Sequence, residues 1–179
     1  MHNRETVQKA LGDGTLKGFF PFYGAKSFGA QVGKECLSNH YICTFEEKGV
    51  QYQSVEQYTM AGKATLFNDT ISFNMIMKTS CPKAAKKLGR SVKDFDEHTW
   101  MQNRIDIVRV GLELKFSQNP ALAAFLSSTG NKVLIEASPS DTIWGVGLSQ
   151  ANPGILDMSL WRGENLLGFL LMEVRDSIS

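Results

Sequence analysis

The longest helix signal in the chain is the stretch EHTWMQNRIDIVRVGLELKFS, residues 97–117. Apolar residues recur along it at spacings of three and four, which places them on one face of an α-helix. We expect this face to turn toward the core, through Met101, Ile105, Val108, Leu112 and Phe116. A helix of this length, with shorter helix signals on both sides, favours a mainly helical fold.

The shorter helix signals lie before and after this stretch. Ser54 is a typical helix cap, and Gln57, three residues later, predicts a capping box for a helix that ends near Asn68. Pro82 and Gly89 bracket another helix. Further helices are expected over 120–129 and 165–177.

Strand signals are fewer and shorter. Residues 19–23 are aromatic, residues 133–137 form a buried apolar run, and residues 41–45 and 50–53 flank a Gly-containing turn, as in a hairpin. The predicted class is therefore α+β, a predominantly helical single domain with a small β-sheet. Residues 1–18 are polar and interrupted by glycine, so we expect a flexible N-terminal segment before a domain over residues 19–179.

The overall composition limits which binding partners and which cellular compartment are expected. The chain has 179 residues, with 19 Lys and Arg against 18 Asp and Glu. This balance gives no global basic field for binding a nucleic-acid backbone. The three cysteines lack metal-ligand spacing and are typical of reduced thiols, and neither a signal peptide nor a membrane span is indicated. We expect a soluble, intracellular, cytoplasmic protein.

The common nucleotide and metal motifs are absent from the sequence. Gly33-Lys34 and Gly62-Lys63 lack the following Ser or Thr of a P-loop, and Gly145-Val146-Gly147 lacks a third glycine. His2, His40 and His98 have no partners at ligand spacing and are expected to be surface or internally satisfied histidines. We therefore expect no metal and no cofactor.

Glu56 and Lys63 lie seven residues apart on one predicted helix, almost two full turns, so both side chains leave the same face. A carboxylate and an amine in apolar surroundings can shift each other's pKa and take part in acid–base or nucleophilic chemistry. The alternative is structural. In that case Glu56 favours the helix dipole near its N-terminus and Lys63 is solvated, and the spacing alone favours this second interpretation.

A second candidate follows the strand over 133–137. Ser138 to Trp161 form a long irregular loop, which in a compact domain suggests function. Trp144 is suited to stack on a flat base, and Asp141 to accept a hydrogen bond from an amine or hydroxyl. Equally, Asp141 is a turn-former and Trp144 a core residue.

Basic residues form a third candidate. Trp100 and Arg104 share a helix face one turn apart, which suits a grip on a base and a phosphate. Arg90 follows a helix end, and Arg109 and Lys115 complete the set. Taken singly, each of these is more often a surface charge.

Together these residues belong to an ordered set of motifs. The set comprises Leu37-Ser38-Asn39-His40-Tyr41, Ser54-Val55-Glu56-Gln57-Tyr58 with Ala61-Gly62-Lys63-Ala64, Gly89-Arg90, Trp100, Lys115-Phe116, Asp141-Thr142-Ile143-Trp144-Gly145-Val146-Gly147, Gly163-Glu164-Asn165-Leu166-Leu167-Gly168 and Leu171-Met172-Glu173-Val174-Arg175. This set resembles the YbiA-like, or NADAR, family over residues 22–175, with His40 where the family more usually has Phe.

The resemblance implies a hydrolase of N-glycosidic bonds. Its two associated substrate classes are ADP-ribose on a guanine amine, in a nucleoside or nucleic acid, and a ribosylamino-pyrimidine phosphate of riboflavin synthesis. The family's active-site positions correspond here to Glu56, Lys63, Trp100, Asp141 and Trp144, with Arg90 as an anion contact. Asn39, His40 and Arg104 complete the expected substrate contacts.

Two mechanisms are compatible with these residues. Glu56 stabilises a cation-like C1′ or activates water, or a neutral Lys63 forms a Schiff base with the opened sugar while Glu56 moves protons. Two other classes of protein stay open. A non-catalytic module that binds ADP-ribose or NAD would use the same Trp and Arg residues, whereas a helical interaction protein would bind no nucleotide.

Overall fold

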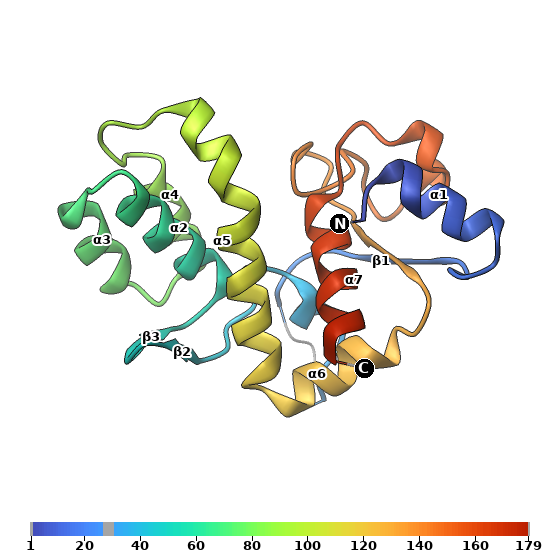
Figure 1. Cartoon of the computed structure of the whole chain (residues 1–179), viewed down its shortest axis with the longest axis horizontal. Coiled ribbons are helices and arrows are strands. Elements are labelled where there is room, and N and C mark those ends of the chain that lie inside the picture. Colours follow the sequence, from blue (N-terminus) through green and yellow to red (C-terminus); the bar gives the residue numbers. More distant parts are fainter. Residues whose placement is uncertain (1, 27–30, 179) are drawn as a thin grey trace. The chain divides into compact units, whose positions relative to one another are not determined.

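The computed structural model describes residues 2–26 and 31–178. By internal contacts the chain divides into two compact units, each described by itself: residues 1–38 with 121–179, and residues 39–120. Figure 1 shows the elements of both. We refer to them as the split unit and the central unit. Within the described residues, every helix is too short or too polar to traverse a lipid bilayer.

The central unit is a helical cluster with one hairpin. Its helices are α2 (Val55–Leu66), α3 (Thr70–Met77), α4 (Pro82–Gly89) and α5 (Glu97–Ser117), and α2 packs against the other three. Gly111 and Gly62 let α2 and α5 approach closely. A Cβ at Gly111 would lie 2.7 Å from the Tyr58 ring, and one at Gly62 would lie 2.8 Å from Ile107. Helix α2 is therefore held on several sides, which fixes the direction of its polar side chains.

The hairpin of the central unit pairs β2 (Phe45–Glu47) with β3 (Val50–Tyr52) antiparallel. Lys48 and Gly49 both have positive φ, at 51° and 81°, as a two-residue type I′ turn requires. The first strand, predicted over 41–45, is therefore shifted toward the turn, because the turn takes only Lys48 and Gly49. The second strand begins at Val50 as predicted and ends one residue earlier.

The split unit is built on a parallel pair of strands. Strand β1 (Phe19–Phe22) pairs with β4 (Val133–Glu136), with Phe19 opposite Val133. Helix α7 (Leu166–Ile178) packs on β4, and a Cβ at Gly168 would lie 2.1 Å from the Leu134 carbonyl oxygen. Asn165 donates to that carbonyl and accepts from the Glu136 amide, so the start of α7 is fixed to the strand.

The other elements of the split unit are short. They are α1 (Arg4–Gly12), the 3₁₀ helices η1 (Lys34–Leu37), η2 (Pro153–Leu156) and η3 (Met158–Leu160), and α6 (Pro120–Ser128), which begins at the boundary between the units. The long loop predicted after β4 is present and contains η2 and η3.

The predicted fold class, α+β with mostly helix, is confirmed. The strands form two separate two-stranded sheets. The predicted bounds of α4 and α5 agree with the structure. Met101 is an exception on the predicted core face of α5, because 52% of its surface is exposed.

Two helices lie where the sequence analysis placed none. Helix α1 falls inside the segment predicted to be flexible; Asn3 and Thr6 form a reciprocal cap there, and Val7 is fully buried. Helix α3 begins at Thr70 and is capped by Asp69. The preceding residue, Asn68, has a φ of 55°, which breaks the chain direction after the end of α2. Thr6 replaces the Glu or Gln usual in a capping box, which explains why the first signal was missed.

Candidate active site on helix α2

The first turn of α2 carries Glu56 into the interior of the central unit. The Ser54 hydroxyl accepts a hydrogen bond from the Gln57 amide, as the sequence predicts for a helix cap. The reciprocal half of the predicted capping box is wrong, because the Gln57 side chain accepts from the Gln53 amide and donates to the Ile76 and Thr79 carbonyls. The Glu56 amide donates to the Asn39 carbonyl at 2.9 Å. Asn39 is thereby held beside the start of α2.

The Glu56 carboxylate is buried and only partly satisfied. The residue is 6% exposed, and its Oε2 lies 3.3 Å from His40 Nε2. Its Oε1 is buried without a hydrogen-bond partner among the described residues, and so is Oδ1 of Asn39, which is 8% exposed. An unsatisfied buried acceptor costs about 1–3 kcal/mol. Two such acceptors on adjoining segments indicate a place prepared for hydrogen-bond donors of a ligand.

The last turn of α2 carries Lys63 into an aromatic environment. Its Nζ lies 3.9 Å from the ring centroid of Phe95 and 5.4 Å from that of Trp100. Phe95 is held by an edge-on contact with Phe67. Burial lowers the pKa of Lys63 below its ordinary value, and the negative charge of Glu97 partly opposes this shift. A lowered pKa increases the neutral fraction of the amine, which is the form that acts as a nucleophile.

Glu56 and Lys63 belong to one continuous helix but make no contact with each other. Seven residues correspond to a rise of about 10.5 Å along the axis. The expectation that they shift each other's pKa is not supported, because the carboxylate that acts on Lys63 is that of Glu97. The two groups can therefore serve one reaction only through a ligand that both contact.

The predicted basic set does not form one cluster. Arg104 on α5 is 7% exposed, and its Nε is buried without a hydrogen-bond partner among the described residues. Arg90, just after α4, is exposed, and Arg109 pairs with Asp106. Lys115 is fully buried beside the rings of Tyr41 and Phe116. Arg104 is thus the buried cation of this set that is best suited to an anionic ligand.

The remaining two predicted residues belong to the split unit. Asp141 Oδ1 accepts hydrogen bonds from the amides of Ile143 at 3.0 Å and Trp144 at 2.8 Å, so Asp141 does form a turn. Its other carboxylate oxygen makes no hydrogen bond within the described part of the chain. Trp144 is half-buried and does not fill the core. This loop belongs to the split unit, whereas the α2 residues belong to the central unit.

The structure thus brings together Asn39, His40 and Glu56 at one end of α2, and Lys63 and Trp100 at the other. It adds Phe95 and Glu97, which the sequence analysis missed. Phe95 lies just before α5, and Glu97 is the first residue of that helix. Both reach Lys63 through tertiary packing, which local sequence patterns do not predict. The sequence feature that could have drawn attention to them is the run Asp94-Phe95-Asp96-Glu97 at the start of the predicted helix. By itself, such a run indicates only a helix cap.

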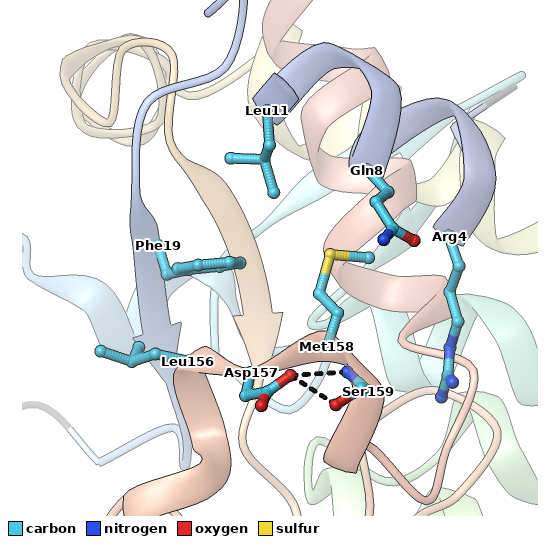
Figure 2. Close-up of a pocket in the computed structure, with 8 residues that line it drawn as sticks. All are labelled: Arg4, Gln8, Leu11, Phe19, Leu156, Asp157, Met158 and Ser159. Carbon is cyan, nitrogen blue, oxygen red and sulfur yellow. Dashed lines mark hydrogen bonds between the residues drawn. The ribbon is translucent and has the colours of Figure 1, made fainter. Parts of the chain in front are cut away.

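A separate groove of about 410 Å³ lies in the split unit, lined by α1 and by residues 156–159 (Figure 2). None of the predicted site residues lines it. Across the described ranges, no three His, Cys, Asp or Glu side chains gather as a metal site would require.

Comparison with known proteins adds the family. The NADAR domain model matches residues 22–179. The chain is 42% identical over 160 residues to N-glycosidase R617 of Acanthamoeba polyphaga mimivirus, covering 87% of this chain and 93% of that protein. It is 31% identical over 142 residues to riboflavin biosynthesis protein VVA0006 of Vibrio vulnificus, covering 79% of this chain and 35% of that protein.

A solved structure is also similar. The NMR structure of the Escherichia coli protein YbiA matches with a TM-score of 0.72 and 26% identity, covering 90% of this chain and 85% of that one. Several relatives are named N-glycosidases, which confirms the predicted class of N-glycosyl hydrolase. On the extent of the domain match and of the viral relative, this chain belongs to the NADAR domain family.

Proposed function

We propose that this enzyme removes ADP-ribose from the exocyclic amine of guanine in a nucleoside or nucleic acid. The observation that carries the proposal is the buried Glu56 carboxylate, which has one oxygen at His40 and the other without a partner among the described residues. A buried carboxylate oxygen without a partner among the described residues is costly for the fold, so a role toward a ligand explains it best. The near-neutral net charge suits recognition of one modified nucleotide more than of a long backbone.

Glu56 acts on the sugar carbon in this proposal. The glycosidic C–N bond breaks as the leaving amine takes a proton from solvent and C1′ becomes cation-like, a charge that a nearby carboxylate stabilises. Water then adds to C1′ and gives up a proton, which Glu56 is suited to accept. The products are a free sugar and an intact guanine amine.

Lys63 offers a second route through a covalent intermediate. The sugar ring opens to an imine, the neutral Lys63 amine adds to C1′, and the guanine amine leaves as the lysine imine forms. Water then hydrolyses that imine and frees the sugar. The lowered pKa of Lys63 supports this route, because burial between aromatic rings keeps more of the amine neutral.

The other predicted residues take binding roles. Asn39 Oδ1 accepts a hydrogen bond from a substrate hydroxyl or amine, and His40 orients Glu56. Arg104 provides a buried cation for a phosphate, and Trp100 a flat surface for a ring. Further contacts, with an anion at Arg90, an amine or hydroxyl at Asp141 and a base at Trp144, rest on the family resemblance.

An alternative substrate is a ribosylamino-pyrimidine phosphate. A relative named for riboflavin biosynthesis favours it, and so does Arg104, the single buried arginine of the central unit, which matches one phosphate. The chemistry at C1′ is unchanged, because the leaving group is again an amine.

The test compares three substrates: ADP-ribosylated guanosine, a DNA oligonucleotide carrying the same modification, and a ribosylamino-pyrimidine phosphate. Free sugar product is followed by mass spectrometry for the wild type, Glu56→Ala and the control Glu46→Ala, which alters an exposed carboxylate of the same unit. We expect ADP-ribose release by the wild type and the control, but not by Glu56→Ala. Release only from the pyrimidine phosphate would select the alternative, and release from none of the three substrates would contradict both substrate assignments.

A further inference from the structure

Arg4 connects helix α1 to residues 161–163 of the split unit, which lead into α7. Its Nη2 donates to the carbonyl oxygens of Trp161, at 3.0 Å, and of Gly163. The guanidinium also lies 5.9 Å from the centroid of the Trp161 ring. Figure 2 shows Arg4 extending from α1 alongside the turn that holds Asp157 and Ser159. One side chain thus contacts two successive points of the segment that leads into α7.

The segment that Arg4 contacts is the one that holds the loop over residues 141–147. The amides of Arg162 and Gly163 donate to the Val146 carbonyl, and those of residues 164–167 donate to the carbonyls of Thr142, Gly145, Ile143 and Trp144 at 2.8–3.2 Å. Gly163 packs so closely that a Cβ there would lie 2.2 Å from the Gly145 carbonyl oxygen. A shift of residues 161–163 would therefore move the loop that carries Asp141 and Trp144.

Helix α1 is anchored by contacts of its own, so it can act as a fixed support. Asn3 and Thr6 cap it reciprocally, and Val7 is fully buried. Before the helix, the His2 amide donates to Glu173 Oε1 at 2.7 Å, and the His2 ring lies 3.2 Å from Asp176. Helix α1 also precedes residue 22, where the match to the NADAR domain begins. The support therefore lies outside the part of the chain that the domain model matches.

We propose that Arg4 is a positioning residue, through which helix α1 fixes residues 161–163 and with them the loop that carries Asp141 and Trp144. The proposal rests on the proposed function, since it assumes that this loop binds substrate. A loop that is ordered before binding loses less conformational entropy on binding, so loosening it weakens ground-state binding. Such a change raises KM with little effect on kcat.

Two measurements on Arg4→Ala test this role. Hydrogen exchange followed by mass spectrometry reports on the amides of residues 162–167, and steady-state kinetics with ADP-ribosylated guanosine reports on KM and kcat. We expect about tenfold faster exchange confined to this segment, with KM raised about three- to tenfold and kcat within about twofold. Arg4→Lys should restore part of both effects, because an ammonium group can reach one of the two carbonyls.

The matched control is Lys9→Ala, which removes an exposed positive charge from the same helix. It should leave exchange and KM at wild-type values. Unchanged exchange in Arg4→Ala would overturn the proposal, and so would faster exchange spread evenly over the split unit, since that would make Arg4 merely structural. The hydrogen-exchange measurement needs no substrate. If the wild type is inactive toward ADP-ribosylated guanosine, the proposed function is contradicted, but hydrogen exchange still tests whether Arg4 holds residues 161–163 in place.

Discussion

The two ends of helix α2 differ in what surrounds their charged side chain. At the first turn, Glu56 is buried with one oxygen beside His40 and the other without a hydrogen-bond partner among the described residues. At the last turn, Lys63 is half-buried between Phe95 and Trp100, and burial lowers its pKa. The first environment holds a hydrogen-bond acceptor ready for a ligand, whereas the second favours a neutral amine. A single helix can thus offer two kinds of reactivity, because its two ends pack against different segments.

A large effect that would sharpen this comparison is expected at the lysine end. Lys63→Met keeps most of the aliphatic contact with Phe95 and Trp100 and removes the amine. If Lys63 is the nucleophile, turnover falls on the order of 10³-fold. Borohydride added with substrate should then trap a covalent adduct on Lys63 of the wild type, located by peptide mass. No adduct, together with near-normal turnover of Lys63→Met, would leave only the direct route through Glu56.

A smaller effect is expected at Arg104, which lies on α5, the helix that also carries Trp100. Arg104→Met fills a similar volume and removes a buried cation that has no hydrogen-bond partner at Nε among the described residues. Since a hydrogen bond to a charged group contributes about 1.5–3 kcal/mol, KM for a phosphorylated substrate should rise about 10- to 100-fold. Thermal unfolding should occur at the same or a higher temperature.

The control for Arg104→Met is a second substrate. A glycoside that lacks phosphate should bind wild type and Arg104→Met equally well, because the lost contact is to the phosphate. A rise in KM for both glycosides would show that Arg104 supports the site in some other way, and an early unfolding transition would show that it supports the fold.

The smallest effect is expected from Glu97, whose negative charge raises the pKa of Lys63 against the effect of burial. Glu97→Gln removes that influence, so the pKa of Lys63 falls further. The neutral amine then appears at lower pH, and the acidic limb of the kcat profile moves to lower pH. The shift should shrink at 1 M salt, where the Debye length is about 3 Å.

Glu113→Gln, an exposed change on the same helix, is the comparison for Glu97→Gln. It should leave the pH profile unchanged. A limb that moves to higher pH in Glu97→Gln would contradict the assignment of that limb to Lys63.

The sequence predicted the positions of helices better than it predicted the tertiary contacts. The bounds of α5 were predicted from its apolar period, and the structure adds the cap, in which the Asp96 side chain accepts from the Thr99 amide. Met101 lies on the same apolar period yet is exposed, because periodicity gives a face but not its extent. The contact of Lys63 with Phe95 and the pairing of Glu56 with His40 depend on how segments far apart in sequence pack, which local patterns do not encode.

The candidate site shows the same limit. Resemblance to a family singled out Glu56 and Lys63, and spacing placed them on one helix. Neither showed that Glu56 has an unsatisfied oxygen or that Glu97 is the carboxylate that acts on Lys63. Arg4, outside the matched domain, had no motif to mark it.

The most direct test of the central claim is a paired measurement on Glu56→Gln, which keeps the shape of the side chain and removes its negative charge. Turnover of ADP-ribosylated guanosine and the free energy of unfolding are measured on the same preparation. We predict that turnover falls about 10²- to 10⁴-fold, while the free energy of unfolding stays equal or rises by about 1 kcal/mol. Retained turnover with a loss of stability would contradict the account, because Glu56 would then serve the fold and not the reaction.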